Sequence, residues 1–189
     1  VLAHDLHHAA VEVVLPEDRG LAQDEAGIAE LEEEAVDAVQ VAVRAERGER
    51  HFALVRWGLI PSWLKEIVPG KPLINARGET VLEKPSFRNA MKRRRCLIPA
   101  DGFYEWKREG KTKQPYYIRF KDHRGFAFAG LWERWEKHEA DPLETCTLIT
   151  TGPNAVMEPI HDRMPVILFS KDFADWLDTS LQAVERVNA

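Results

Sequence analysis

The chain has 189 residues, of which 44% are hydrophobic and 30% charged, an ordinary composition for one globular domain with a sizeable core. No apolar run reaches the roughly 18–20 residues that span a bilayer, and the start lacks the basic residues of a secretory signal. Membrane and exported classes are therefore excluded, and a cytoplasmic location is expected. Since the only cysteines are Cys96 and Cys146, without zinc-like spacing to histidine, we expect buried free thiols, no disulfide framework, no metal and no cofactor.

The net charge of −5 is unevenly distributed along the chain. Residues 1–50 carry a charge of −9, whereas the remaining residues carry +4, with bases concentrated at 88–95 and 107–113. A basic stripe of this kind suits the phosphate backbone of a nucleic acid. The simpler alternative is a solvated, basic end of a helix.

The first 40 residues differ in composition from the rest of the chain. All 17 aromatic residues lie at or after Phe52. Residues 24–39 have helical spacing, with Ile28, Leu31 and Val39 on one stripe. We interpret this atypical acidic segment, 1–40, as an amphipathic helix, a poorly ordered extension, or the product of a shifted reading frame or misplaced start. The domain itself is expected at 41–189.

From residue 39 onward the apolar residues follow the period of two that is typical of β-strands. Residues 39–43 and 52–56 predict a hairpin around a turn at 46–49. Residues 116–120 and 126–132 are expected to pair around a second turn. The other expected elements are strands at 95–98, 103–107, 145–151 and 165–169, sharp turns at 59–63 and 109–111, and helices at 80–91, 154–158 and 171–177. Many strands and few helices predict a single α+β domain on a largely antiparallel sheet.

Two ionisable side chains stand in stretches that are suited to hold a reactive group. Glu105 lies between Tyr104 and Trp106, and a carboxyl group walled by aromatic rings loses hydration, so its pKa rises and it can act as a general acid or base. The alternative is a surface strand residue whose neighbours face the core. His161 lies in a segment stiffened by two prolines, where it can exchange protons at physiological pH or be a structural histidine held by Asp162.

A second group of residues is suited to bind rather than to react. Asn75 and Arg77 flank Ala76 and would point the same way on a strand, offering an amide and a guanidinium group that suit phosphate or carboxylate. Trp57 and Trp63 flank the sharp turn. They belong to the core, or one of them presents a face on which a base can stack.

Six motifs occur in a fixed order along the chain. They are Arg-Trp-Gly-Leu-Ile-Pro-Ser-Trp at 56–63, Ile-Asn-Ala-Arg-Gly-Glu-Thr at 74–80, Pro-Ser-Phe at 85–87, Arg-Arg-Cys-Leu-Ile-Pro-Ala-Asp-Gly-Phe-Tyr-Glu-Trp at 94–106, Phe-Ala-Gly-Leu-Trp at 128–132 and Ile-His-Asp-Arg-Met-Pro-Val-Ile-Leu at 160–168. In type and order they resemble the SOS response-associated peptidase (SRAP) family, whose members capture abasic sites in single-stranded DNA. The resemblance covers roughly residues 41–177 and implies a barrel-like sheet with short helices.

The resemblance also implies a role for each site residue. Asn75 would position an N-terminal cysteine, Glu105 would act as general acid and base, and His161 would assist opening of the sugar ring and proton transfer. The residues implied at the DNA-binding surface are Trp57, Trp63, Arg77, Arg88, Thr150 and Arg163. The expected partner is single-stranded DNA with abasic sites, bound by a monomer that is nucleoid-associated on DNA during the DNA damage (SOS) response.

In this family the cysteine after the initiator methionine forms a thiazolidine crosslink with the open-chain aldehyde of the abasic site, and the same site resembles a peptidase that removes that methionine. The family begins Met-Cys-Gly-Arg-Phe, whereas this chain begins Val1-Leu2-Ala3-His4. An α-amine without a thiol is expected to form at most a reversible Schiff base. Two alternatives therefore stay open, namely a catalytically silent single-stranded DNA binding module and a thiol-independent abasic-site lyase.

Overall fold

The computed structural model describes residues 11–14, 39–67, 72–136 and 142–179. The helix expected over 24–39 lies outside the described residues except for Val39, which begins a strand. The elements in chain order are β1 (Val11–Val14), β2 (Val39–Glu46), β3 (Glu49–Trp57), β4 (Asn75–Arg77), η3 (Gly78–Thr80), α2 (Arg88–Arg93), β5 (Arg95–Ala100), β6 (Phe103–Glu109), β7 (Thr112–Phe120), β8 (Phe126–Trp135), β9 (Leu143–Thr151), β10 (Met164–Pro165), β11 (Ile167–Leu168), η4 (Ser170–Asp172) and α3 (Phe173–Leu177).

Five strands close into a barrel. Strand β9 pairs with β3, β3 with β2, β2 with β5, β5 with β8, and β8 again with β9. All of these pairings are antiparallel except that of β3 with β9. A closed ring of strands leaves no exposed edge within it. The expected α+β domain on a largely antiparallel, barrel-like sheet is therefore confirmed.

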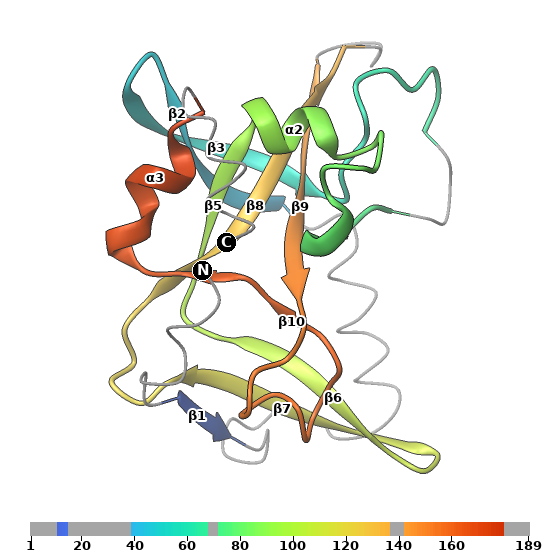
Figure 1. Ribbon diagram of the computed structural model, residues 1–189, viewed down its shortest axis with the longest axis vertical. Helices are drawn as coiled ribbons and strands as arrows, with labels where there is room; N and C mark the ends of the chain where they lie inside the picture. The colour runs from blue at the N-terminus through green and yellow to red at the C-terminus, as the bar shows by residue number, and fades with distance from the viewer. Residues whose placement is uncertain (1–10, 15–38, 68–71, 137–141, 180–189) are drawn as a thin grey trace.

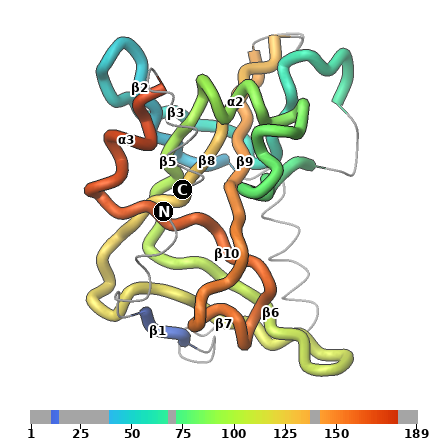
Figure 2. The backbone as a smooth tube through the Cα atoms, viewed as in Figure 1, coloured from blue at the N-terminus to red at the C-terminus, as the bar shows by residue number. Residues whose placement is uncertain are grey.

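A second sheet of three antiparallel strands, in the order β1-β7-β6, lies below the barrel in Figure 1. The chain passes from β5 into β6 and returns from β7 to β8 (Figure 2). The expected pairing of 116–120 with 126–132 is consequently wrong. Strand β7 belongs to the small sheet and β8 to the barrel, because the continuously buried run Phe126–Leu131 requires a partner strand on each side.

The hairpin of β2 and β3 forms in the expected register, from Val39 opposite Arg56 to Glu46 opposite Glu49. Its two-residue turn has positive φ at both Arg47 (53°) and Gly48 (84°), as a twisted hairpin requires. The face that it buries carries Ala42 and Val55. The larger side chains on the opposite face, which are Val39, Val41, Phe52 and Leu54, are exposed.

The expected helix at 80–91 is shorter in the structure. It begins only at Arg88, after turns in which Lys84 O accepts from both Phe87 N and Arg88 N. Pro85 explains the late start, because proline lacks an N–H donor and its ring clashes with the carbonyl four residues earlier in a helix. The helix at 171–177 is confirmed as η4 and α3, with Trp176 buried. No helix in the described ranges is long and apolar enough to cross a membrane.

The helix expected at 154–158 is absent from this described part of the chain, where two consecutive turns take its place. The Asn154 carboxamide accepts hydrogen bonds from Val156 N (3.1 Å) and Met157 N (3.0 Å), as at the start of a helix. Pro159, however, lacks the N–H donor that the next turn of a helix would need. The final strand expected at 165–169 is divided between β10 and β11, which are buried as expected and pair with β9 and β8.

Both cysteines are fully buried and free, as expected. Burial raises the pKa of Cys146 to about 12 and raises that of Cys96 well above its ordinary value. Both thiols therefore stay protonated and act as small apolar side chains.

Arg95 ties the C-terminal helix to the barrel. Its guanidinium is 2% exposed and donates to three carbonyl oxygens, those of Trp176 (2.6 Å), Asp178 (2.6 Å) and Met91 (3.0 Å). The same group lies 5.4 Å from the ring centroid of Trp176. A buried cation is tolerated only when hydrogen bonds replace its lost hydration, and here the ends of α2 and α3 supply them.

We expect Arg95→Met to lower the free energy of unfolding by about 2–4 kcal/mol, because the substitution leaves buried carbonyl groups without a donor. Urea denaturation followed by circular dichroism measures the change. Arg93→Met is the matched control on the exposed side of α2 and should change stability by less than about 0.5 kcal/mol. Equal stabilities of the two variants would contradict this role of Arg95.

Candidate functional site

Strand β4 presents two polar side chains on one face. Asn75 and Arg77 are exposed whereas Ala76 between them is fully buried, so the expected common direction of the two is confirmed. The strand runs parallel to β9 with Arg77 opposite Thr150. Thr150 is 9% exposed, and it lies at the end of β9 from which the chain leaves the barrel.

The chain that follows β9 makes two consecutive turns before His161. In Figure 1 this segment of the chain, between β9 and β10, descends toward the small sheet. The backbone N–H of His161 donates to Met157 O (2.9 Å). When the ring is neutral, Nδ1 can accept from Arg163 N (3.1 Å), which leaves the proton on Nε2. When the ring is protonated, Nδ1 can donate to the carboxylate of Asp162 (3.3 Å). Nδ1 has a partner in both cases, so the orientation of the ring is the same with and without a proton on Nδ1.

Arg163 fixes this segment to the barrel. Its guanidinium donates to both carboxylate oxygens of Glu79 (2.7 and 3.0 Å) and to the carbonyl oxygen of Thr150 (2.7 Å). The hydrogen bond from Arg163 lowers the pKa of the Glu79 carboxyl group. Arg163 therefore already binds a carboxylate, that of Glu79. That Arg163 holds a phosphate stays a prediction, and the phosphate would compete with Glu79 for the guanidinium group.

The pKa of Glu105 is raised, as its sequence context suggests, but the aromatic residues beside the carboxyl group are not the expected Tyr104 and Trp106. Burial of the carboxyl group raises the pKa, the positive charge of His161 lowers it, and Asp162 raises it further. Tyr104 and Trp106 lie on the opposite face of β6, because side chains alternate along a strand, and Tyr104 packs on Tyr117 there. Two half-buried aromatic residues lie on the same face of the sheet as Glu105. They are Phe103 and the cross-strand neighbour Tyr116, and they shield the carboxyl group from water.

Glu105 lies in the small sheet and His161 in the loop that leaves the barrel, and the charge of His161 acts on the Glu105 carboxyl group. One side chain is a carboxyl group with raised pKa, and the other is an imidazole of fixed orientation. Such a pair can give and take protons near neutral pH. The sequence predicted both residues, but it did not predict that Asp162 acts on the charge of Glu105 or that Glu79 pairs with Arg163. Glu79 could have been found, since it lies in the same motif as Arg77.

The two tryptophans of the first motif occupy different environments. The indole N–H of Trp57 donates to Ile74 O (2.9 Å), and the ring packs half-buried against the core. Trp57 thereby fixes the peptide group between Ile74 and Asn75. Trp63 is 55% exposed, so its side chain is accessible to a ligand. Arg88 is exposed on α2, which packs on β5 and β8, and no side-chain bond joins it to the other predicted residues within the described ranges.

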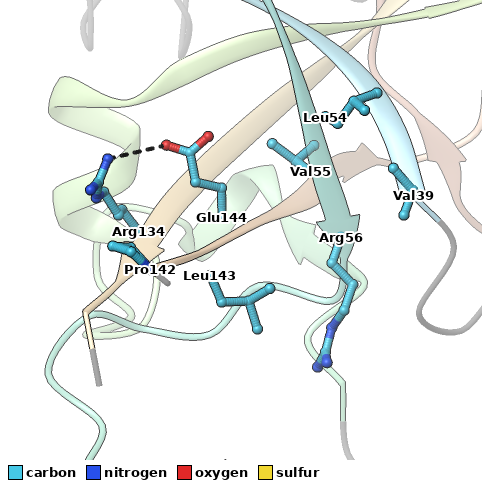
Figure 3. A pocket seen from close by; sticks show the side chains of 8 residues that line it. All are labelled: Val39, Leu54, Val55, Arg56, Arg134, Pro142, Leu143 and Glu144. Carbon is cyan, nitrogen blue, oxygen red and sulfur yellow. Dashed lines mark ion pairs between the residues drawn. The ribbon is translucent and has the colours of Figure 1, made fainter. Parts of the chain in front are cut away.

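One open hollow of about 540 Å³ lies elsewhere on the barrel, beside β3 and the start of β9 (Figure 3). It is lined by Val39, Leu54, Val55, Arg56, Arg134, Pro142, Leu143 and Glu144. None of these belongs to the predicted site, so the acid–base pair is not at this hollow. In the described part of the chain, no group of three His, Cys, Asp or Glu residues is arranged to hold a metal ion.

Two substitutions beside Glu105 should move its pKa in opposite directions. His161→Gln removes a positive charge that favours the carboxylate, so the pKa of Glu105 should rise; Asp162→Asn removes a repelling negative charge, so it should fall. A carbon-13 NMR titration of the side-chain carboxyl group, assigned with Glu105→Gln, measures both. Shifts of the same sign in the two variants would contradict the arrangement.

Comparison with known proteins agrees with these motifs and this fold. Residues 16–189 match the family SOS response associated peptidase (SRAP). The chain is 57% identical over 125 residues to the abasic site processing protein YoqW of Bacillus subtilis (66% of this chain, 56% of that protein) and 38% identical over 157 residues to the abasic site processing protein HMCES of Xenopus tropicalis (71% and 47%). The chain thus spans about half the length of these relatives.

The fold has a solved counterpart as well. A crystal structure of a protein from Bacteroides thetaiotaomicron is similar with a TM-score of 0.72 and 33% identity, over 80% of this chain and 68% of that one. The ordered motifs, the closed barrel and the family match lead to one conclusion. This chain belongs to the SOS response associated peptidase (SRAP) family.

Proposed function

We propose that this protein recognises abasic sites in single-stranded DNA and processes them with the acid–base pair Glu105 and His161. The observation that carries the proposal is that His161, whose ring is held by the backbone of Arg163, acts by its charge on the half-buried carboxyl group of Glu105, whose pKa is raised by burial. The names of the curated relatives, which are abasic site processing proteins, support DNA as the substrate.

The exposed polar and aromatic residues suit a single strand better than a duplex. Arg77 and Arg88 are exposed cations that can neutralise phosphates. Trp63 has an open indole face, and only an unpaired base can stack fully on such a face. Thr150 and Asn75 add polar groups next to Arg77. A single strand that crosses β4 can therefore combine phosphate pairing with stacking.

The covalent part of the proposal follows the chemistry of an aldehyde. An abasic sugar in its open form carries an aldehyde, to which the amine and thiol of an N-terminal cysteine add with loss of one water to give a thiazolidine. Opening the sugar ring and expelling water both require proton transfer, which is the role of His161 and Glu105. Asn75 would hold the cysteine, and removal of the initiator methionine would use the same pair as a peptidase. We keep the monomer as the expected functional state.

A second candidate is a binding module that holds single-stranded DNA without reacting. The exposure of Trp63 and Arg77 favours it, because neither residue depends on the acid–base pair for its contact with DNA. The two candidates differ in one observable, which is a covalent product that survives denaturation.

We expect tighter binding to a single-stranded oligonucleotide than to its duplex, with affinity falling as salt rises. Trp63→Ala should weaken binding by ~1–3 kcal/mol through lost stacking, and Arg77→Ala should reduce the slope of log K against log salt by about 0.7. Fluorescence anisotropy across a salt series measures all three quantities. The control is Phe52→Ala, which removes another exposed aromatic ring, on the outer face of β3, and should bind normally. Equal affinity for both forms of DNA would refute the proposal.

We expect the acid–base pair to control rate rather than affinity. In a variant whose chain begins Met-Cys-Gly-Arg-Phe, Glu105→Gln and His161→Ala should each slow crosslinking to abasic DNA by about 10²–10⁴ with little change in binding. Time courses at saturating DNA, resolved on denaturing gels from acid to neutral pH, give the rates. The limb due to Glu105 should lie above the ordinary carboxyl range, since burial raises its pKa. Wild-type rates in Glu105→Gln would assign it a purely structural role.

A further inference from the structure

The loop that carries Trp63 is bonded to the barrel at every second residue. Ile60 N donates to Thr145 Oγ1 (3.0 Å), Ser62 N donates to Glu133 Oε2 (3.0 Å), and Leu64 O accepts from Trp135 Nε1 (2.9 Å). The three supporting side chains are at most 6% exposed. This set of bonds, which we call the loop clamp, therefore attaches an irregular segment to two paired strands of the barrel, β8 and β9.

The supports of the loop clamp form one continuous face of the sheet. Glu133 on β8 lies directly opposite Thr145 on β9, so their side chains project on the same side. Trp135 is two residues beyond Glu133 on β8 and shares that side. The spacing of the supports along two adjacent strands thus matches the spacing of alternate backbone groups in the loop.

Trp63 stands at the corner of a turn between two clamped positions. Leu64 N donates to Pro61 O (3.0 Å), which closes a turn with Trp63 as its third residue. The clamp holds Ser62 N on one side of Trp63 and Leu64 O on the other. The bond from Leu64 N fixes the peptide group that follows Trp63, and the clamp fixes the peptide group one residue further away on each side. These bonds restrict the direction in which the Trp63 side chain leaves the backbone.

Glu133 is a charged residue on a buried face of the sheet, where its carboxylate loses its hydration. Its carboxylate is 3% exposed and is bonded to Arg94 Nη1 as well as to Ser62 N. The Arg94 side chain is 34% exposed, so only the carboxylate of this ion pair is buried. Burying a carboxylate rarely adds net stability, and the best-attested benefit of such a group is conformational specificity. Here the conformation specified is that of the loop with Trp63.

We propose that Glu133 and Thr145 are positioning residues that hold Trp63 as a rigid stacking surface for a base beside the abasic site. The proposal rests on the proposed function. A preformed surface avoids the entropy cost of ordering a mobile aromatic side chain on binding. Removing the clamp should therefore weaken binding while the indole itself is still present.

Thr145→Val tests this with minimal change in shape, because valine replaces the hydroxyl group by a methyl group and leaves Ile60 N without its acceptor. We expect about 3- to 10-fold weaker binding of a single-stranded oligonucleotide. Thr145→Ser keeps the acceptor and should bind like the wild type. In the background Trp63→Ala, Thr145→Val should cause no further loss, since the clamp acts through Trp63.

A spectroscopic readout of the protein without DNA separates positioning from general destabilisation. The chain contains six tryptophans, and labelling with 5-fluorotryptophan gives each a fluorine NMR signal, that of Trp63 being assigned by its loss in Trp63→Phe. Thr145→Val should shift and narrow the Trp63 signal selectively, and Thr145→Ser should restore it. Glu133→Gln, which keeps an acceptor for Ser62 N but removes the charge that pairs with Arg94, should have a smaller effect of the same kind and serves if Thr145→Val does not fold.

The outcomes distinguish the clamp from the proposed function. If Trp63→Ala weakens DNA binding but Thr145→Val and Glu133→Gln do not, or if the Trp63 signal is unchanged in both clamp variants, the positioning role is overturned and DNA binding stands. If the wild type does not bind single-stranded DNA, the proposed function is overturned, and the role of the clamp in DNA binding falls with it.

Discussion

Strand β9 is the element on which the rest of the structure depends. It pairs with β3 and β4 in parallel and with β8 and β10 antiparallel. Because β9 bonds to both β3 and β8, it closes the barrel, and because its last residues bond to β4 and β10, it also aligns the segments that carry Arg77 and Arg163. Thr145 and Thr147 within it are fully buried, as a strand with neighbours on both sides requires. A change in its register would shift the barrel and the site together.

Charged side chains at the periphery of the barrel hold irregular backbone in place. Arg95 caps the end of α3, Arg163 ties the loop after β9 to Glu79, and Glu133 holds the loop before β4. Each of these groups replaces its lost hydration with hydrogen bonds to carbonyl, carboxylate or amide groups. Loops in general are mobile and variable, so a site assembled from loops gains precision from such attachments.

The proposed acid–base pair combines one residue of the small sheet with one residue of a loop that leaves the barrel. Glu105 belongs to the small sheet, whereas His161 is carried by the chain that leaves the barrel. Burial raises the pKa of the Glu105 carboxyl group, and the charge of His161 opposes that effect. The balance between desolvation and a nearby cation sets the proton affinity of Glu105, so the packing of the two sheets determines the chemistry available at the site.

The sequence alone determined the identity and order of the motifs, the class of the fold, the hairpin of β2 and β3, and the common direction of Asn75 and Arg77, because these depend on local periodicity and turn chemistry. The tertiary structure alone decided which face of that hairpin is buried, since alternation marks two faces without saying which one meets the core. It also decided that β7 and β8 belong to different sheets, that Glu79 pairs with Arg163, and that Phe103 and Tyr116 rather than Tyr104 and Trp106 flank Glu105. These outcomes depend on contacts between residues far apart in the chain, and a local sequence pattern does not reveal which of these contacts form.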